Sequence, residues 1–366
     1  MTAKNNPPLY IRMSQLIIGI LAFFYILYIG QDIILPLIFS LIIAILLNPM
    51  VNFLERKLNR IISITIAVIV AMIIVLGLLF FIGSQATMFS DSLPQLKLKF
   101  AEILSNTIQW IANTFNVSPT QINAWIAKTK SEGMSNSTSV IGQTLSTLSG
   151  ILVIVFLIPV YIFLFLYYKP LLLDFIAKLF PTEKHETVVD VLTETKSLIS
   201  KYLGGLMLEF AIVATLNTTA LLLLGIEYAL LLGVVGGLLN IIPYIGGIIS
   251  ISMPMILALA TKEPIYALYV FGAYTLIQVI DNNFINPIIV ASKVKINAIV
   301  SIVVVLVGGA IWGFAGMFLS LPLTAIIKVV FDRIDQLKPF GFLLGDTMPP
   351  IGNNVLVFRK VKKKKN

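Results

Sequence analysis

Residues 240–247 read N-I-I-P-Y-I-G-G and lie inside an uncharged, largely apolar run over residues 228–261. As one continuous helix this run of 34 residues would be about 50 Å long, which exceeds a hydrocarbon core of about 30 Å. Pro243 removes a backbone donor and clashes with the preceding turn, while Gly246 and Gly247 permit a tight backbone turn. The sequence therefore predicts a helix that breaks near its middle and folds back as a hairpin.

The apolar run over residues 296–330 contains a second interruption of the same kind. Both runs have an apolar-Val-Gly-Gly segment, then an aromatic residue two positions before a Gly, then Ser-x-Pro. The matching segments are 234–237, 244–246 and 252–254 in the first run, and 306–309, 314–316 and 320–322 in the second. Chance matching is the alternative, because Gly and Pro are frequent in membrane helices. The common order favours a repeated broken hairpin.

The composition is that of a membrane protein. The 366 residues are 58% hydrophobic and only 12% charged, with a mean hydropathy of +0.97, whereas soluble domains carry about 25% charged residues. Segments that cross lipid must be helices or a closed barrel, and barrel strands alternate in polarity as these runs do not. We expect an all-α polytopic membrane protein with about six full spans plus two broken, re-entrant hairpins, or about eight to ten spans if the hairpins cross.

Two features of the composition limit the chemistry. The chain has no cysteine and one histidine, His185, so disulfides, thiol chemistry and Cys- or His-cluster metal sites are excluded. The first apolar run follows Lys4 and Arg12 and could be read as a secretory signal, but a second span begins after Gln31-Asp32, which favours a retained span. We expect neither a metal nor a cofactor.

The distribution of Lys and Arg predicts cytoplasmic N- and C-termini. The expected regions are a three-span region (1–83), an extracytoplasmic helical insertion (84–147), a transport core (148–335) and a basic cytoplasmic tail (336–366). The core includes an amphipathic cytoplasmic helix (182–201) and the hairpins 228–261 and 296–330. A basic tail can bind nucleic acid, but beside a membrane domain we expect it to lie on anionic lipid and assign no nucleic-acid partner.

The insertion has helical signals of its own. Leu104, Ile108, Ile111 and Phe115 recur at helical spacing, and a capping box at residues 118–121 opens a short helix through Trp125. We expect these helices to pack on each other or on the membrane surface.

Charged side chains within the spans are few and mark candidate functional sites. Glu209 and Asp281 are the main ones, and Asp281 lies in the polar segment Q-V-I-D-N-N-F-I-N-P, residues 278–287. Alternatively, its amides only hold helices together, at about 1 kcal/mol each. The candidate solute pathway comprises Asn240, Pro243, Tyr244, Gly246, Gly247, Gln278, Asp281, Asn282, Asn286, Pro287, Gly308, Gly309, Gly316 and Pro322, with Asp281 and Glu209 as candidate groups for proton or cation coupling.

Three segments resemble the autoinducer-2 exporter family of bacterial permeases. They are N-I-I-P-Y-I-G-G with Pro254, D-N-N-F-I-N-P-I-I-V (281–290) and V-G-G-A-I-W-G-F-A-G-M-F-L-S-L-P-L (307–323). The resemblance covers roughly residues 150–335, and the chain departs from the family pattern at Gly247, Ala291 and Ala298. It implies an oligomeric multi-span permease of the bacterial inner membrane. Members have been linked to export of a small polar signalling molecule and, for some, to exchange of Na⁺ or Li⁺ for H⁺.

We therefore expect a secondary transporter that exports a small polar solute, with the two hairpins forming a site near the membrane midplane. The alternative within transport is a cation/proton antiporter that uses Asp281 or Glu209. An intramembrane enzyme would need Glu209 and Asp281 to meet and lacks the usual motifs, so we expect no enzyme. A scaffold that binds a partner through residues 84–147 is the remaining alternative.

Overall fold

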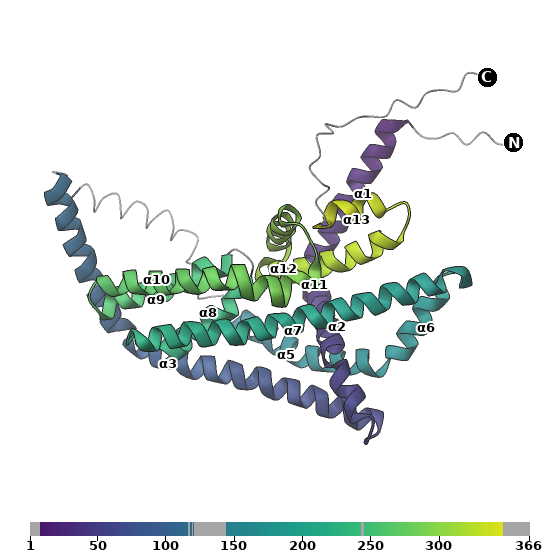
Figure 1. Cartoon of the computed structure of the whole chain (residues 1–366), viewed down its shortest axis with the longest axis horizontal. Coiled ribbons are helices and arrows are strands. Elements are labelled where there is room, and N and C mark those ends of the chain that lie inside the picture. Colours follow the sequence, from purple (N-terminus) through teal and green to yellow (C-terminus); the bar gives the residue numbers. More distant parts are fainter. Residues whose placement is uncertain (1–7, 116–117, 119, 121–143, 243–244, 347–366) are drawn as a thin grey trace.

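The computed structural model describes residues 8–115, 118, 120, 144–242 and 245–346. Within these residues every secondary-structure element is a helix (Figure 1). Ile296 and Gly345 form an isolated antiparallel bridge. Five described helices are long and apolar enough to cross a membrane, or six if one bent pair counts as a span. The expected helical membrane class is confirmed.

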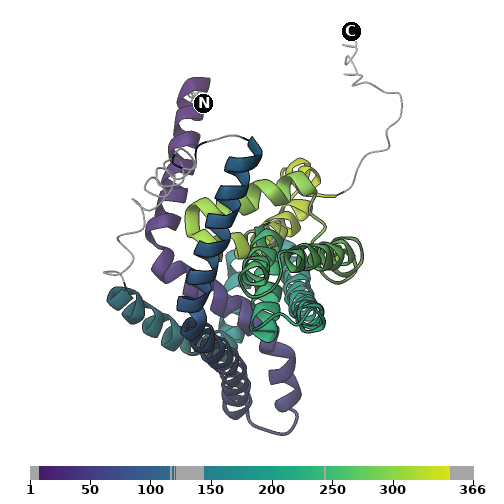
Figure 2. The same cartoon turned by 90° about the vertical axis from the view of Figure 1, so that its left-hand side faces the viewer.

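The first helices of the chain are α1 (Leu9–Ile29), α2 (Gln31–Leu54), α3 (Arg60–Phe115) and α5 (Thr144–Tyr167), of which α2, α3 and α5 form one packing unit. Buried apolar side chains of α2, α3 and α5 form a common core, and Arg60 Nη2 donates to the carbonyl oxygens of Leu166 (2.9 Å) and Tyr167 (2.8 Å). Helix α1 stands apart from this core, with most of its apolar side chains exposed (Figure 2).

Helix α3 does not end at the expected boundary near Gly83 but continues to Phe115, with Pro94 inside it. A single glycine costs a helix only about 1 kcal/mol, so Gly83 is too weak a signal to end it. Residues 84–115 of the expected insertion thus prolong a membrane-length helix. The short helix expected from the capping box at 118–121 lies largely outside the described residues.

Helix α7 joins two segments that the sequence suggested were separate. After α6 (Lys169–Leu179) and the turn η1 (Thr182–Lys184), α7 runs without interruption over His185–Leu223. The amphipathic segment 182–201 therefore passes directly into the apolar segment. No proline lies within α7, which explains its continuity.

A second packing unit follows α7. It consists of α8 (Ala229–Asn240), α9 (Ile245–Thr261), α10 (Ile265–Ile280), the π-helical turns η2 (Asp281–Ile285) and η3 (Pro287–Ala291), and α11 (Ser292–Val294). Helix α8 packs closely on α7 at Gly237, which has no side chain: a Cβ there would lie only 2.8 Å from the Ala214 Cβ. Figure 2 shows these green helices gathered on one side of the molecule.

The chain ends its described part with α12 (Ala298–Arg333) and α13 (Lys338–Leu344). The backbone of α12 leaves the helical conformation at Trp312 and Gly313, and Gly313 has a φ of 57°. Another core of buried apolar residues joins α2, α7, η3, α11 and α12. This core holds the two packing units together beside the polar residues described next.

Candidate functional site

The first break separates α8 from α9 at the predicted position. Helix α8 ends at Asn240 and α9 begins at Ile245, while Pro243 and Tyr244 lie outside the described residues. Gly246 donates its N–H to the Ile242 carbonyl at 3.1 Å. A Cβ on Gly246 would lie only 1.9 Å from the Leu239 carbonyl oxygen, so the start of α9 packs directly on the end of α8.

The polar segment after α10 adopts π-helical turns. The N–H of Asn286 bonds to the Asp281 carbonyl, five residues back, and Pro287 has no N–H to continue the α-helical pattern. Such turns are rare and frequently occur at functional sites. Here the side chain of Asp281 accepts a hydrogen bond from Asn240 Nδ2 at 2.8 Å, so the end of α8 is tied to η2.

Glu209 reaches the same place from α7. A Cβ on Gly205 would lie 2.6 Å from the Ile289 carbonyl oxygen, which shows that η3 passes close to α7 at this glycine. One turn further along α7, Glu209 Oε1 accepts a hydrogen bond from Asn286 Nδ2 at 3.0 Å. The carboxyl groups of Glu209 and Asp281 lie close enough for a side-chain interaction, and each residue is only 2% exposed.

These side chains border a cavity of about 880 Å³. The predicted residues that line it are Glu209, Asn240, Gly247, Gln278, Asp281, Asn282 and Asn286. They come from α7, α8, α9, α10 and the π-helical turns, so the cavity lies where the first break meets the polar segment. A cavity mostly lined by apolar side chains with a few convergent polar groups is typical of a small-molecule site.

Gly247 and Gln278 are matched in shape. A Cβ on Gly247 would lie 2.7 Å from Gln278 Oε1, so the amide occupies the space that a larger residue would fill. Gln278 Nε2 also donates to Asn282 Oδ1 at 3.3 Å. The absence of a side chain at position 247 thus leaves room for this amide beside the cavity.

The other predicted pathway residues lie elsewhere. Gly246 forms the turn, and Pro287 begins η3. A Cβ on Gly308 would lie 2.5 Å from the Gly316 carbonyl oxygen, so α12 folds back on itself at this point, and Gly309 packs against Met317. Pro322 is buried within α12. Of α12, the residues that border the cavity are Ala298, Ser301 and Leu321.

Tyr202 and Tyr274 also line the cavity and were not singled out from the sequence. Tyr274 is 5% exposed, and its hydroxyl has no hydrogen-bond partner within the described part of the chain. A tyrosine within an apolar span carries a polar end that usually needs a partner, and this signal could have marked both residues.

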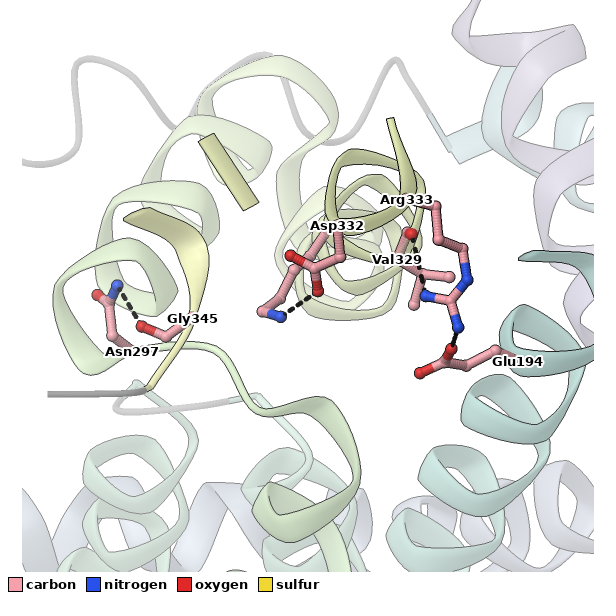
Figure 3. Close-up of polar contacts among 7 residues, drawn as sticks. Glu194, Asn297, Val329, Asp332, Arg333 and Gly345 are labelled. Carbon is pink, nitrogen blue, oxygen red and sulfur yellow. Dashed lines mark hydrogen bonds and ion pairs between the residues drawn. The ribbon is translucent and has the colours of Figure 1, made fainter. Parts of the chain in front are cut away.

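Ile296 and Asp346 border the cavity where the segment before α12 meets the end of α13 (Figure 3). Asn297 caps α12 by accepting the Val300 N–H at 2.9 Å, and its Nδ2 donates to the carbonyls of Leu343 (2.7 Å) and Gly345 (3.2 Å). An Asn directly before an apolar run is a helix-start signal that the sequence offered.

Arg333, at the end of α12, links this helix to α7. Its guanidinium group pairs with the Glu194 carboxylate (Figure 3). Its Nη2 also lies 3.5 Å from Asp190 Oδ2. Both acids belong to the charged first part of α7. The ion pair therefore joins the helix that carries Glu209 to the end of α12.

Comparison with known proteins now identifies the family. The model of the AI-2E family transporter matches residues 17–336. The chain belongs to this family. It is 23% identical over 276 residues to YueF of Bacillus subtilis (strain 168), across 72% of this chain and 74% of YueF.

Two relatives from Escherichia coli (strain K12) match shorter regions. PerM, named as a permease, is 27% identical over 222 residues, which cover 57% of this chain and 60% of PerM. TqsA, named as an AI-2 transport protein, is 28% identical over 123 residues, which cover 34% of this chain and 36% of TqsA. The chain thus spans less than two thirds of the length of these two relatives.

Family membership and the apolar helices establish a multi-pass membrane protein of a transporter family. Transporters of this kind are membrane-embedded proteins that handle small solutes and are not classed as enzymes.

Proposed function

We propose that the protein is a secondary transporter that exports a small polar solute across a bacterial cytoplasmic membrane, with the cavity at the first break as its solute site. The observation that carries the proposal is the meeting of two buried carboxyl groups, Glu209 and Asp281, beside a broken helix and two π-helical turns. Ionisable groups inside a membrane are costly, and irregular backbone there is tolerated where it lines a cavity.

The two broken helices are proposed to be re-entrant hairpins that enter from opposite faces. Helix α8 has 12 residues and is about 18 Å long, which is too short to cross a core of about 30 Å. Transporters with paired repeats bind solutes where such discontinuous helices meet. In this arrangement both termini are cytoplasmic, and the protein assembles as a homo-oligomer with residues 148–335 as its transport core.

The sequence allows a test of alternating access, because the natural chain has no cysteine. A single cysteine replaces Asn282, which lines the cavity and is exposed, and is labelled with a membrane-impermeant reagent in right-side-out and inside-out vesicles. We expect labelling from both sides, with a ratio that changes when a proton or sodium gradient is imposed. A cysteine at position 282 that is labelled from neither side in any condition would refute the proposal.

A cation/proton antiporter is the second candidate function, and the direct approach of Glu209 to Asp281 favours it. Two buried carboxyl groups in one site can exchange a proton for another cation. Asp281→Asn is expected to reduce sodium-driven proton movement in proteoliposomes at least about tenfold, because a coupling carboxylate is removed. The matched control is Glu227→Gln at an exposed span edge. Full exchange activity in Asp281→Asn would reject this candidate.

A further inference from the structure

The cavity has a polar side and an apolar side. Its charged lining residues, among those that the structure describes, are all acidic: Glu209, Asp281 and Asp346. Aliphatic side chains border the remainder, including Leu206, Ile241, Ile248, Ile251, Val290 and Leu321. A ligand that fits both sides has a polar head and an aliphatic body.

The acidic side contains acceptor atoms that receive no N–H or O–H donor from the described part of the chain. Glu209 Oε2 and Asp281 Oδ1 are both buried in this way, and the two carboxyl groups lie against each other. Leaving a buried carboxylate oxygen unpaired costs free energy, so such atoms usually have a partner. These two oxygens therefore mark a place for hydrogen-bond donors.

The neighbouring amides reinforce this preference. Asn240 Nδ2 and Asn286 Nδ2 are already used as donors, at 2.8 Å to Asp281 and 3.0 Å to Glu209. Each of these amide groups therefore already donates to one carboxylate oxygen of the protein. Each carboxyl group thus has one oxygen bonded to an amide and a second oxygen without a donor, and an anionic ligand would be repelled by the pair.

We propose that the transported solute is a small organic cation whose ammonium head lies between Glu209 and Asp281 and whose aliphatic body lies against the apolar wall. This inference rests on the proposed function and specifies its substrate class. An ammonium group has three donors and a positive charge, which suits two carboxylate acceptors. The volume of about 880 Å³ and the aliphatic wall favour an organic cation over a bare metal ion, which would leave that wall unused.

The test compares probes of one shape and three charges on the unaltered full chain. Binding of n-butylammonium, 1-butanol and butyrate is measured by calorimetry at neutral pH in lipid nanodiscs, with empty nanodiscs as the background. We expect n-butylammonium to bind at least about tenfold more tightly than 1-butanol, and butyrate to bind more weakly still, because a charge-assisted hydrogen bond contributes about that much. Each added CH₂ group of the alkylammonium should tighten binding about fourfold until the cavity is filled.

Variants then locate the bound head group. Glu209→Gln and Asp281→Asn should each weaken n-butylammonium binding at least about tenfold, whereas Glu227→Gln should leave it unchanged. Thermal unfolding of each variant establishes that it is folded, and Asp281→Glu, which keeps the carboxylate, should retain more affinity than Asp281→Asn. Equal binding of the amine and the alcohol, preference for butyrate, or competition by sodium chloride as strong as that by the amine would overturn the inference.

Failure of this inference differs from failure of the proposed function. A cavity that is labelled from both sides of the membrane but does not prefer n-butylammonium would refute the substrate class alone. A cavity that is inaccessible from both sides would refute the transport site itself.

Discussion

The two broken helices share a sequence pattern but have different surroundings. At the first break, Asn240 donates to Asp281 and the backbone borders a cavity with two carboxyl groups. At the second break, Trp312 Nε1 donates to the Leu27 carbonyl of α1 at 2.9 Å, and the two halves of α12 pack on each other. The shared glycines and prolines thus encode a reversal of the chain, whereas the polar chemistry depends on what faces each reversal.

The largest effect is expected at the turn of the first break, where Gly246 should tolerate a side chain less well than Gly313 of the second break. Gly246→Ala should lower the free energy of unfolding by about 3 kcal/mol or more, because its Cβ would lie 1.9 Å from the Leu239 carbonyl oxygen. Gly313→Ala should cost less, about 2 kcal/mol, from backbone strain at φ 57° and ψ −138° alone, since no atom lies within 4 Å of its Cβ. Thermal unfolding in detergent measures both, with Gly272→Ala as the unhindered control. Equal effects at positions 246 and 313 would contradict the close packing of the first turn.

The anchor of the first break should control transport. Asn240→Ala removes a donor to Asp281 and should reduce solute exchange at least about tenfold, since a hydrogen bond to a charged group contributes about 2 kcal/mol. Exchange is measured in proteoliposomes and is normalised to the amount of folded protein. Unaltered exchange in this variant would show that the bond is merely structural.

The anchor of the second break should control stability alone. Trp312→Phe keeps an aromatic ring but loses the bond to Leu27, so we expect a loss of about 1 kcal/mol in unfolding free energy. Exchange per folded protein should stay within about twofold of the unaltered chain, because Trp312 is not among the residues that border the cavity. A large loss of exchange without a loss of stability would place the second break in the solute path.

The smallest effect is expected at Gly247, beside the cavity. Gly247→Ala should displace the Gln278 side chain, whose Oε1 would lie 2.7 Å from the new Cβ. Gln278 is flexible and its bond to Asn282 is long at 3.3 Å, so we expect a change in exchange of only about threefold, with little loss of stability. Comparison with Gln278→Ala checks the cause: the double variant should resemble Gln278→Ala alone. Additive effects would point to a different role for Gly247.

The sequence identified the elements of the site better than their arrangement. The break at 240–247 and the polar segment 278–287 follow from the local chemistry of proline, glycine and amide side chains. The approach of Glu209 to Asn286 does not, because it spans 77 positions and depends on the close contact between Gly205 and Ile289. Local patterns contain no information on which helices meet.

Helix lengths were also hard to predict. Glycine at position 83 and the change from polar to apolar residues after position 201 suggested boundaries, yet α3 and α7 continue through them. When a helix leaves a membrane, the polarity of its side chains changes but its backbone can stay helical, so a change in polarity does not mark the end of the helix. By contrast, the break in α12 was predicted, although the sequence could not show that its glycines pack on each other instead of bordering the cavity.

The difference between the two breaks can be measured with two matched variants, Ile248→Cys and Phe314→Cys. Both native side chains are exposed, at 70% and 57%, but Ile248 lies beside the cavity and Phe314 follows the second break. In lipid vesicles, a water-soluble, membrane-impermeant thiol reagent should modify the cysteine at position 248 at least about tenfold faster than that at 314, because irregular backbone at membrane depth borders water only where there is a cavity. Equal rates, or faster modification at position 314, would contradict the assignment of the solute site to the first break.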